Sequence, residues 1–198
     1  MPIYNVQHHI LLTPSQQDDL AAAITRIHST KFSTPRMFVN VVFTDTSSTR
    51  TYIGGKQRKG NHIVANVRSG PSRTQDDWNE AAAQIAKAWD EIIGVGLPKV
   101  KRSDKEGVDT KLRSLIFLGG MIGGLEAGFV LPAAGQDVQW MHENWDAFQQ
   151  KAREGDEEFA EMVQEVEERG LLGANGEAER DKRRQDRLEE MLGWGEHA

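Results

Sequence analysis

The chain contains one pattern twice, a strand followed by a helix and then by a second strand. The segment QDDLAAAI, residues 17–24, returns in longer form as QDDWNEAAAQI, residues 75–85. Two strands joined by a helix pair in parallel through a right-handed crossover. Two such units predict an α+β fold, a four-stranded sheet with two helices on one face. We expect the first strands of the two units to lie beside each other, start next to start.

Local signals mark the first unit. Residues Ile3 to Val6 favour a short strand. The segment Thr13 to Gln16, TPSQ, is typical of a helix start, because its threonine can cap the helix, its proline suits the first turn and its glutamine can bond back to the cap. Pro35 ends any helix, and the apolar run Met37 to Phe43 predicts a buried strand. Residues Thr51 to Gly55 favour a short hairpin arm.

The second unit follows the same order. Residues His62 to Val67 predict a strand, and either Ser72 or Thr74 can cap the helix that follows. One face of this helix is apolar at helical spacing. The residues of that stripe are Trp78, Ala82, Ile85, Trp89 and Ile92. Gly94 and Pro98 stop the helix.

A charged connection, residues 100–108, leads to a further buried strand, Leu115 to Leu118. This strand opens the apolar segment 115–132, which contains Glu126 and many glycines. We interpret the segment as a strand followed by a glycine-rich loop rather than as a membrane span. We therefore expect no membrane partner.

These patterns divide the chain into a domain at residues 1–135 and a charged helical C-terminal extension at residues 136–198. The composition changes at Asn144, after which Glu, Lys and Arg are frequent. A weak amphipathic stripe, interrupted by Gly155, predicts helical structure there. Its members are Phe148, Ala152, Phe159, Met162, Val163 and Val166. A last charged helix is expected from Glu177 to Leu192.

Composition narrows the function classes. The formal net charge is −6, whereas a nucleic-acid binder presents a basic face. The chain has no cysteine, which excludes disulfides and thiol catalysis and agrees with the cytoplasmic location that we expect. The adjacent His8 and His9 would point to opposite faces of a strand and chelate poorly. We expect no metal and no cofactor.

Pro2 is the first candidate for catalysis. Initiator methionine is normally removed before a small residue, which would leave the secondary amine of proline at the start of a strand. Proline tolerates that place because it has no hydrogen to donate to the ladder. An α-amino group titrates near pH ~8 when nothing perturbs it. Burial and nearby cations lower that pKa and give a neutral base, whereas a carboxylate raises it and gives an acid.

Four charged or ionisable residues are further candidates. Arg68 and Arg73 flank a Gly-Pro turn directly after the second unit's first strand, and arginine binds carboxylates through paired hydrogen bonds. Solvated surface arginines are the alternative. His28 lies at the end of the first helix, where a cation near the helix terminus is the alternative role. Glu126 is the only charge in the apolar segment 115–132, and such a carboxylate is costly unless it is paired or functional.

Five segments occur in a characteristic order: MPIYNV, LTPS with AAAITRIH, YIGGKQRKG, the turn at Arg73, and LEAGFVLP. Over residues 2–132 this order resembles the cis-3-chloroacrylic acid dehalogenase branch of the tautomerase superfamily. The family fold has two β-α-β units per chain and assembles as a homotrimer. The resemblance implies that Pro2 is the catalytic amine. It implies that His28 and Arg73 contact the substrate carboxylate, and that Glu126 orients or activates water.

Two positions depart from the family pattern. Gly70 stands where the dehalogenases have a second arginine, and the nearby Arg68 would point differently. Phe117 stands where they have a tyrosine, whose hydroxyl helps the water. We therefore expect keto–enol tautomerisation of a 2-oxo acid such as phenylpyruvate, with Arg73 and either His28 or Arg68 holding the small-molecule carboxylate substrate.

Two alternatives remain at this level. The first is a hydratase or dehalogenase of cis-3-haloacrylate-like acids, in which Glu126 prepares a water. The second is a non-catalytic trimeric scaffold that uses its charged C-terminal helices as an interaction surface. The scaffold predicts that Pro2→Ala changes nothing, and it tolerates a retained Met1, which would block the amine.

Overall fold

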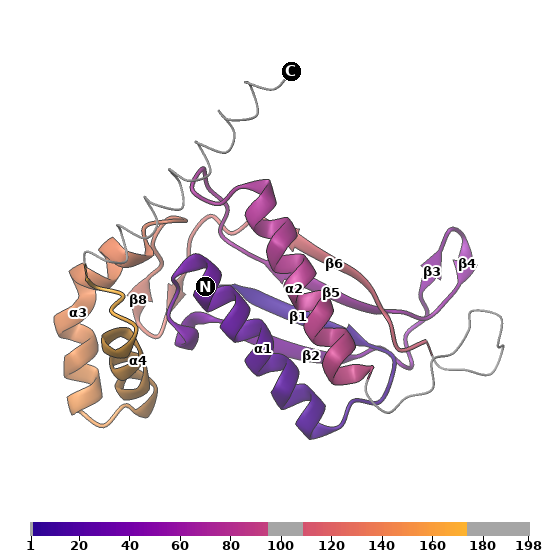
Figure 1. Cartoon of the computed structure of the whole chain (residues 1–198), viewed down its shortest axis with the longest axis horizontal. Coiled ribbons are helices and arrows are strands. Elements are labelled where there is room, and N and C mark those ends of the chain that lie inside the picture. The colour runs from indigo at the N-terminus through magenta and orange to yellow at the C-terminus, as the bar shows by residue number, and fades with distance from the viewer. Residues whose placement is uncertain (1, 95–108, 174–198) are drawn as a thin grey trace, which may run out of the picture. The chain divides into compact units, whose positions relative to one another are not determined.

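The computed structural model describes residues 2–94 and 109–173, which fall into two compact units, Met1–Gly135 and Gln136–Ala198. Each unit has its own strands or helices and its own buried core. The elements of the first unit are β1 (Ile3–His8), α1 (Pro14–Phe32), the 3-10 helix η1 (Arg36–Phe38), β2 (Asn40–Asp45), β3 (Tyr52–Ile53), β4 (Lys56–Gln57), β5 (Asn61–Asn66), α2 (Gln75–Ile93), β6 (Leu112–Leu118), β7 (Leu125–Glu126) and β8 (Phe129–Val130) (Figure 1).

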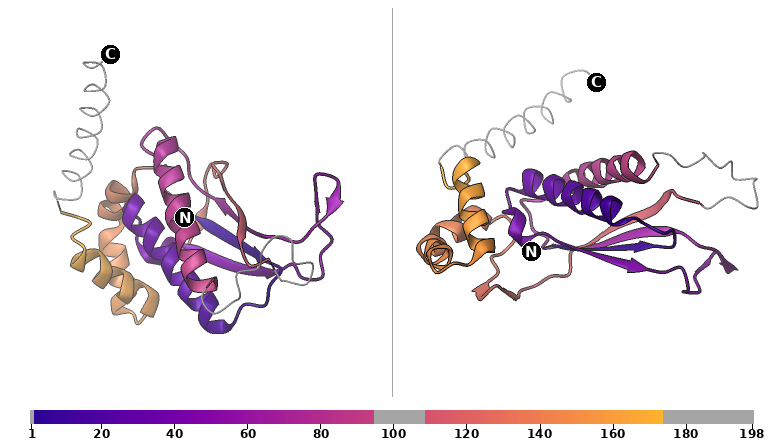
Figure 2. Two further views of the ribbon diagram at one scale, coloured as in Figure 1. Left: turned by 45° about the vertical axis from the view of Figure 1, so that its right-hand side comes forward. Right: turned by 90° about the horizontal axis from the view of Figure 1, so that it is seen from below.

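A four-stranded mixed sheet in the order β2-β1-β5-β6 forms the centre of the first unit. β1 pairs in parallel with β2, and β5 pairs in parallel with β6, as the repeated strand–helix–strand pattern predicts. Helices α1 and α2 lie side by side on one face of this sheet (Figure 2). The predicted fold class is thus confirmed.

The two units of the repeat are joined differently from our expectation. β1 and β5 are antiparallel, with Ile3 opposite Asn66, so the start of β1 lies beside the end of β5 and not beside its start. The second unit therefore runs in the opposite direction to the first, as if related to it by a two-fold axis. The pairing of β1 with β5, two strands distant in sequence, sets this direction. The consequence is that Arg68 and Arg73, which follow β5, belong to the same end of the sheet as Pro2.

Helices α1 and α2 both begin with a capping box. The Thr13 side chain accepts the N–H of Gln16, whose own side chain accepts the N–H of Thr13, and this capping box is the predicted one. Thr74, not Ser72, caps α2 in the same way with Asp77. α2 ends at Ile93, directly before Gly94, as predicted.

The core lies between the sheet and the two helices. Its buried residues alternate along the strands and recur at helical spacing along α1 and α2. They are Tyr4, Val6, Ile10, Leu12, Leu20, Ile24, Val39, Ile63, Ala65, Val67, Ile85, Trp89 and Ile93. In α2, Ala81 and Ile93 are buried where the sequence pattern favours Ala82 and Ile92, which are only half-buried.

The predicted buried strand Met37 to Phe43 is only partly correct. Pro35 starts a 3-10 turn, in which the N–H of Phe38 bonds the carbonyl of Pro35, and the strand begins later, at Asn40. Its outer residues are open to solvent, since Val42 is 50% exposed. The predicted hairpin arm is present as β3 and β4, with Gly54 and Gly55 at positive φ in its turn.

β6 is likewise less buried than predicted. Leu115 and Phe117 pack against the core, but Ile116 is 47% and Leu118 46% exposed. Side chains alternate along a strand, so Ile116, Leu118 and Val42 point to the sheet face opposite α1 and α2. That face is therefore apolar in part, and these three side chains are about half exposed.

The second unit contains α3 (Asp137–Arg153) and α4 (Glu157–Glu168), separated by Gly155 at a φ of 95°. Aromatic rings pack between them, with Phe148 and Phe159 at 5.7 Å between centroids. The described part of the extension, residues 136–173, is thus mainly helical, as predicted, although α3 begins before Asn144. The expected helix 177–192 and connection 100–108 lie outside the described residues.

Within residues 2–94 and 109–173, no helix is long and apolar enough to cross a membrane.

Candidate active site

Pro2 is buried at the start of a central strand. The next residue, Ile3, pairs with Asn40 of β2 on one side and with Asn66 of β5 on the other. The N–H of Asn40 donates to the Pro2 carbonyl oxygen at 3.1 Å. Pairing on both sides holds the first residues of β1 in place.

Asn40 also connects Pro2 with Glu126. Its side-chain amide donates a hydrogen bond to Glu126 Oε1 at 3.0 Å. One residue therefore reaches the candidate catalytic residue through its backbone and the candidate carboxylate through its side chain. The sequence interpretation missed Asn40, although a polar residue inside the apolar run Met37 to Phe43 is the signal that could have found it.

A tight hairpin presents Glu126. β7 and β8 pair antiparallel, with Glu126 opposite Phe129, and the two turn residues Ala127 and Gly128 have φ values of 50° and 89°. Positive φ at both central residues is the geometry of a type I′ turn. Ala127 adopts a conformation that glycine or asparagine usually takes, so the local backbone is strained directly next to the carboxylate.

His28 lies inside the protein, on the helix-covered side of the sheet. It is 1% exposed, and its Nδ1 is 2.9 Å from the hydroxyl oxygen of Tyr4, which is fully buried in β1. Its other ring nitrogen, Nε2, is buried and has no hydrogen-bond partner among the described residues. His28 is thus not a solvated cation at a helix terminus.

The electrostatics keep this pair uncharged. Burial lowers the pKa of the His28 imidazole well below its usual range, and the positive charges of Arg73 and Arg68 act in the same direction. Burial raises the pKa of the Tyr4 hydroxyl, an effect that Arg73 partly opposes. At neutral pH His28 is therefore a neutral imidazole and Tyr4 a neutral phenol.

Arg73 is 8% exposed and lies over an aromatic ring, with its guanidinium carbon 4.9 Å from the Phe32 centroid. Its side chain also donates to the Arg68 carbonyl oxygen at 3.4 Å. The Phe32 ring is 4.7 Å from the His28 ring between centroids. Arg73 and His28 are therefore gathered around one aromatic side chain.

Phe117 lies in the same aromatic cluster. Its ring centroid is 6.2 Å from that of Tyr4 and 4.8 Å from that of Trp78. All of these residues are on the helix-covered side of the sheet. Phe117 thus packs against the partners of His28 without supplying a hydroxyl.

Arg68 has a different environment. Its guanidinium donates to the backbone carbonyl oxygens of Pro132 and Ala133, at 2.7 and 3.3 Å, and it is 5% exposed. It fastens the chain that follows the Glu126 hairpin. Such an arrangement favours a structural role, and its role as a substrate contact stays a prediction.

Gly70, where the related dehalogenases have arginine, has little free space. A Cβ on Gly70 would lie 3.1 Å from the Cβ of Ala134, closer than ordinary van der Waals contact. Its carbonyl oxygen accepts the N–H of Arg73 and closes the Gly-Pro turn. A side chain at this position requires the Ala134 segment to move.

The residues proposed from sequence therefore converge from two sides on one end of the sheet. Pro2, with Asn40 and Glu126, is linked through hydrogen bonds at the start of β1 and β2. Arg73 and His28 belong to the helix-covered side, where they are linked through aromatic contacts and through Tyr4. If Met1 is removed, a secondary amine, a carboxylate and a guanidinium lie at one end of the sheet, a combination that can move a proton on a small anionic substrate.

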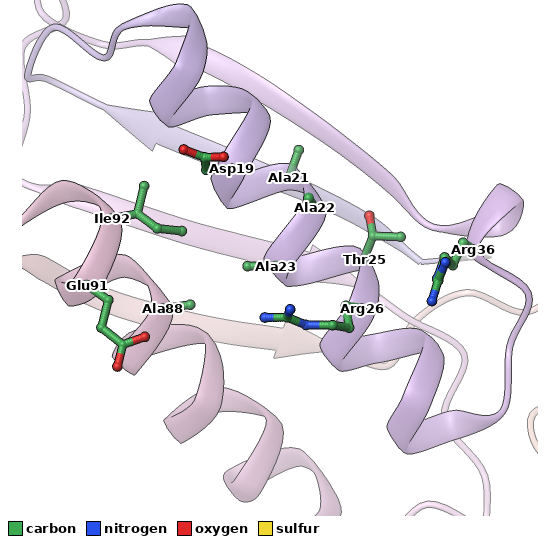
Figure 3. A pocket seen from close by; sticks show the side chains of 10 residues that line it. All are labelled: Asp19, Ala21, Ala22, Ala23, Thr25, Arg26, Arg36, Ala88, Glu91 and Ile92. Atoms are coloured by element: carbon green, nitrogen blue, oxygen red, sulfur yellow. The ribbon is translucent and has the colours of Figure 1, made fainter.

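A cavity of about 790 Å³ lies elsewhere, between the outer parts of α1 and α2 (Figure 3). Alanines and residues of both charges line it, among them Asp19, Arg26, Arg36 and Glu91. None of the six predicted site residues lines this cavity. It does not mark the site where we expect the chemistry.

Across residues 2–94 and 109–173, no three His, Cys, Asp or Glu side chains are grouped so that they could hold a metal ion.

Comparisons with known proteins agree with this architecture. The family described as "Putative oxalocrotonate tautomerase enzyme" matches residues 1–145. The structure of N1, a member of the cis-3-chloroacrylic acid dehalogenase family, is 21% identical with a TM-score of 0.54, and the match covers 80% of this chain and 99% of that one. A search of curated proteins found no match.

Two further solved structures align with this chain at lower TM-scores. A fused 4-OT solved as a symmetric trimer is 16% identical with a TM-score of 0.49, and the match covers 67% of this chain and 98% of that one. Pt0534, solved after inactivation by 2-oxo-3-pentynoate, is 15% identical with a TM-score of 0.47, and the match covers 68% and 96%.

Proposed function

The chain belongs to this oxalocrotonate tautomerase-like family, and from that premise we propose that it is a cofactor-independent tautomerase of small 2-oxo acids. The Pro2 amine is the acid–base catalyst. Arg73 and His28 bind the carboxylate of the substrate. A phenylpyruvate-like acid is the substrate type that we expect.

The observation that supports this proposal most directly is the register of β1. Pairing with β2 and with β5 on either side fixes Pro2 at the sheet end from which Arg68 and Arg73 continue. An amine beside cations favours its neutral form, which is the form that accepts a proton. The same cations attract an anionic substrate.

The reaction moves one proton through two transfers. The Pro2 nitrogen first removes the hydroxyl proton of the enol, which leaves an enolate. The oxygen electrons then form the carbonyl group while the electron pair of the carbon–carbon double bond takes the proton from the Pro2 ammonium at C3. Positioning and charge stabilisation are the contributions of the protein, and the amine returns to its neutral state.

The test compares Pro2→Ala with Pro14→Ala on the enol form of phenylpyruvate. Pro14 lies at the exposed start of α1, far from the chemistry in sequence, and serves as the matched control. We expect Pro2→Ala to lose at least about a hundredfold in kcat/KM, the usual contribution of a positioned acid–base group. A Pro2→Ala protein that keeps the wild-type activity would overturn the role of Pro2, and a wild-type protein without activity would favour the non-catalytic scaffold.

Two mass measurements accompany this assay. Intact mass tests whether Met1 has been removed, because a retained Met1 turns the amine into a peptide nitrogen. The activated alkyne 2-oxo-3-pentynoate can then be added, since a free secondary amine attacks such an acceptor. We expect one label on Pro2, and a label elsewhere or none would count against the amine.

A hydratase activity is the second candidate, and the hydrogen bond from Asn40 to Glu126 supports it. In that reaction Glu126 removes a proton from water, the water oxygen bonds C3 of a cis-3-haloacrylate, and protonated Pro2 gives its proton to C2. The halohydrin then loses hydrogen halide to leave an aldehyde. Turnover of cis-3-chloroacrylate far above that of phenylenolpyruvate would reverse our order of the two activities.

A homotrimer is the assembly that we expect. The sheet face opposite α1 and α2 carries Val42, Ile116 and Leu118, each about half exposed. Apolar residues on an open sheet face favour burial against another surface. Further copies of this chain are the partner that this proposal names.

A further inference from the structure

The buried contact between Tyr4 and His28 determines which nitrogen of the imidazole carries the proton. Tyr4 and His28 are both less than 2% exposed, and the Tyr4 oxygen is 2.9 Å from His28 Nδ1. Neither side chain has another hydrogen bond among the described residues. The rings meet edge to face, with 81° between their planes.

Two arrangements of protons fit the distance. If Nδ1 carries the proton, it donates to the Tyr4 oxygen, and the Tyr4 hydrogen and the Nε2 lone pair are both left without partners. If Tyr4 donates to Nδ1, the hydrogen on Nε2 and the lone pairs of the Tyr4 oxygen are left without partners. Each arrangement thus leaves one donor and one acceptor unpaired. The imidazole nitrogen is a stronger acceptor than the phenol oxygen, and the phenol hydroxyl is a stronger donor than the imidazole N–H, so the second arrangement, which pairs the two stronger groups, is favoured.

Charge does not disturb this choice. Burial lowers the pKa of His28, and the positive charges of Arg73, the N-terminal amine and Arg68 act in the same direction, so the imidazole does not take a second proton. Phe32 and Trp78 lie on the remaining sides, with ring centroids at 4.7 and 6.3 Å. They offer neither a proton nor a charge.

We propose that Tyr4 is a positioning residue that holds His28 as a neutral Nε2–H donor, directed to the carboxylate of the substrate. This inference rests on the proposed function, because it needs a substrate beside His28. His28 then supplies a hydrogen bond and Arg73 supplies the charge. The site thus recognises a carboxylate by one cation and one neutral donor.

The experiment is ¹⁵N NMR of the histidine rings in the resting protein. The chain has six histidines, and the difference spectrum with His28→Gln identifies the His28 signals. We expect Nε2 to have the shift of a protonated nitrogen and Nδ1 that of an unprotonated acceptor. A protonated Nδ1 would overturn the proposal, and this measurement needs no turnover.

The second part uses Tyr4→Phe, with Tyr52→Phe as the control. Tyr52 is the only other tyrosine of the chain and is 60% exposed. We expect Tyr4→Phe to mix the two forms of the His28 ring and to lower kcat/KM about fivefold, as the loss of one oriented neutral hydrogen bond does. Tyr52→Phe should change neither.

The outcomes separate the two proposals. If Tyr4→Phe keeps the wild-type kcat/KM and ring shifts, Tyr4 has no positioning role, while the tautomerase proposal stands. If the wild-type protein has the expected ring shifts but no activity and no label on Pro2, the proposed function fails, and with it the role assigned to the donor.

Discussion

Asn40 donates two hydrogen bonds, one from its backbone to Pro2 and one from its side chain to Glu126. Removal of the side chain leaves the first bond and deletes the second. We therefore expect Asn40→Ala to affect the reaction that uses Glu126 more than the one that uses Pro2 alone. Hydration of cis-3-chloroacrylate should fall about tenfold, the effect of losing a hydrogen bond to a charged group, and tautomerisation less than about twofold.

The measurement is the ratio of the two rates. Asn5→Ala is the control, because the Asn5 side chain accepts a hydrogen bond from Thr44 within the same sheet. Equal losses in both reactions would mean that Asn40 supports the sheet rather than the carboxylate.

His28 makes stability depend on pH. In the unfolded chain its imidazole takes a proton below about pH 6.5, whereas the folded protein resists this because burial lowers the pKa. The stabilisation is complete above pH 6.5. Below it, the free energy of unfolding should fall by about 1.4 kcal/mol per pH unit until the folded-state pKa is reached.

Urea unfolding at several pH values between 5 and 7 checks this prediction. His28→Gln should remove that part of the slope, and the contributions of His9 and His62, whose pKa values are also lowered by burial, remain in both proteins. Identical slopes for the two proteins would show that His28 titrates normally in the fold.

At the scale of elements, the features that depend on a few neighbouring residues, such as the starts and ends of helices, could be predicted from the sequence. The capping box of Thr13 and Gln16 and the helix end before Gly94 depend only on neighbours along the chain, and both are confirmed. The antiparallel pairing of β1 with β5 depends on residues about sixty positions apart, and the expected alignment of strand starts was wrong.

The candidate site divides in the same way. The sequence points to Pro2, His28, Arg73 and Glu126 by their residue types and by their positions in segments whose order resembles the family's. Their roles stay predictions. Asn40 and Tyr4 did not stand out, because a hydrogen bond that spans 86 or 24 positions leaves no local pattern. The sequence also gives no indication that Ala134 limits the space around Gly70.

The hairpin of β7 and β8 offers a prediction about Glu126. Ala127 has a φ of 50°, which glycine adopts freely and a β-branched residue hardly at all. Ala127→Val should therefore distort the turn and lower hydration activity about tenfold, a loss of order 1–2 kcal/mol from strain. Ala127→Gly is the matched control and should keep the activity.

The melting temperature distinguishes a local effect from a global one. The hairpin contributes no residue to the buried core of the first unit, so Ala127→Val should melt within a few degrees of the wild type. A large loss of stability would mean that the turn supports more than Glu126.

At the scale of the whole molecule, the open sheet face predicts assembly. Ile116 is 47% exposed on β6 in a single chain, and a buried carboxylate in its place would be costly. We expect the wild type to sediment as a trimer and Ile116→Glu to shift to the monomer. Ala83→Glu, on the exposed surface of α2, is the control and should stay trimeric.

The inner position of β1 has a consequence for the order of synthesis. The ribosome makes this strand first, yet its partners β2 and β5 end only at Asp45 and Asn66, so the strand must wait for them. Once the sheet has closed, Pro2 is buried. If Pro2 acts as an amine, we therefore expect removal of Met1 to precede closure of the sheet.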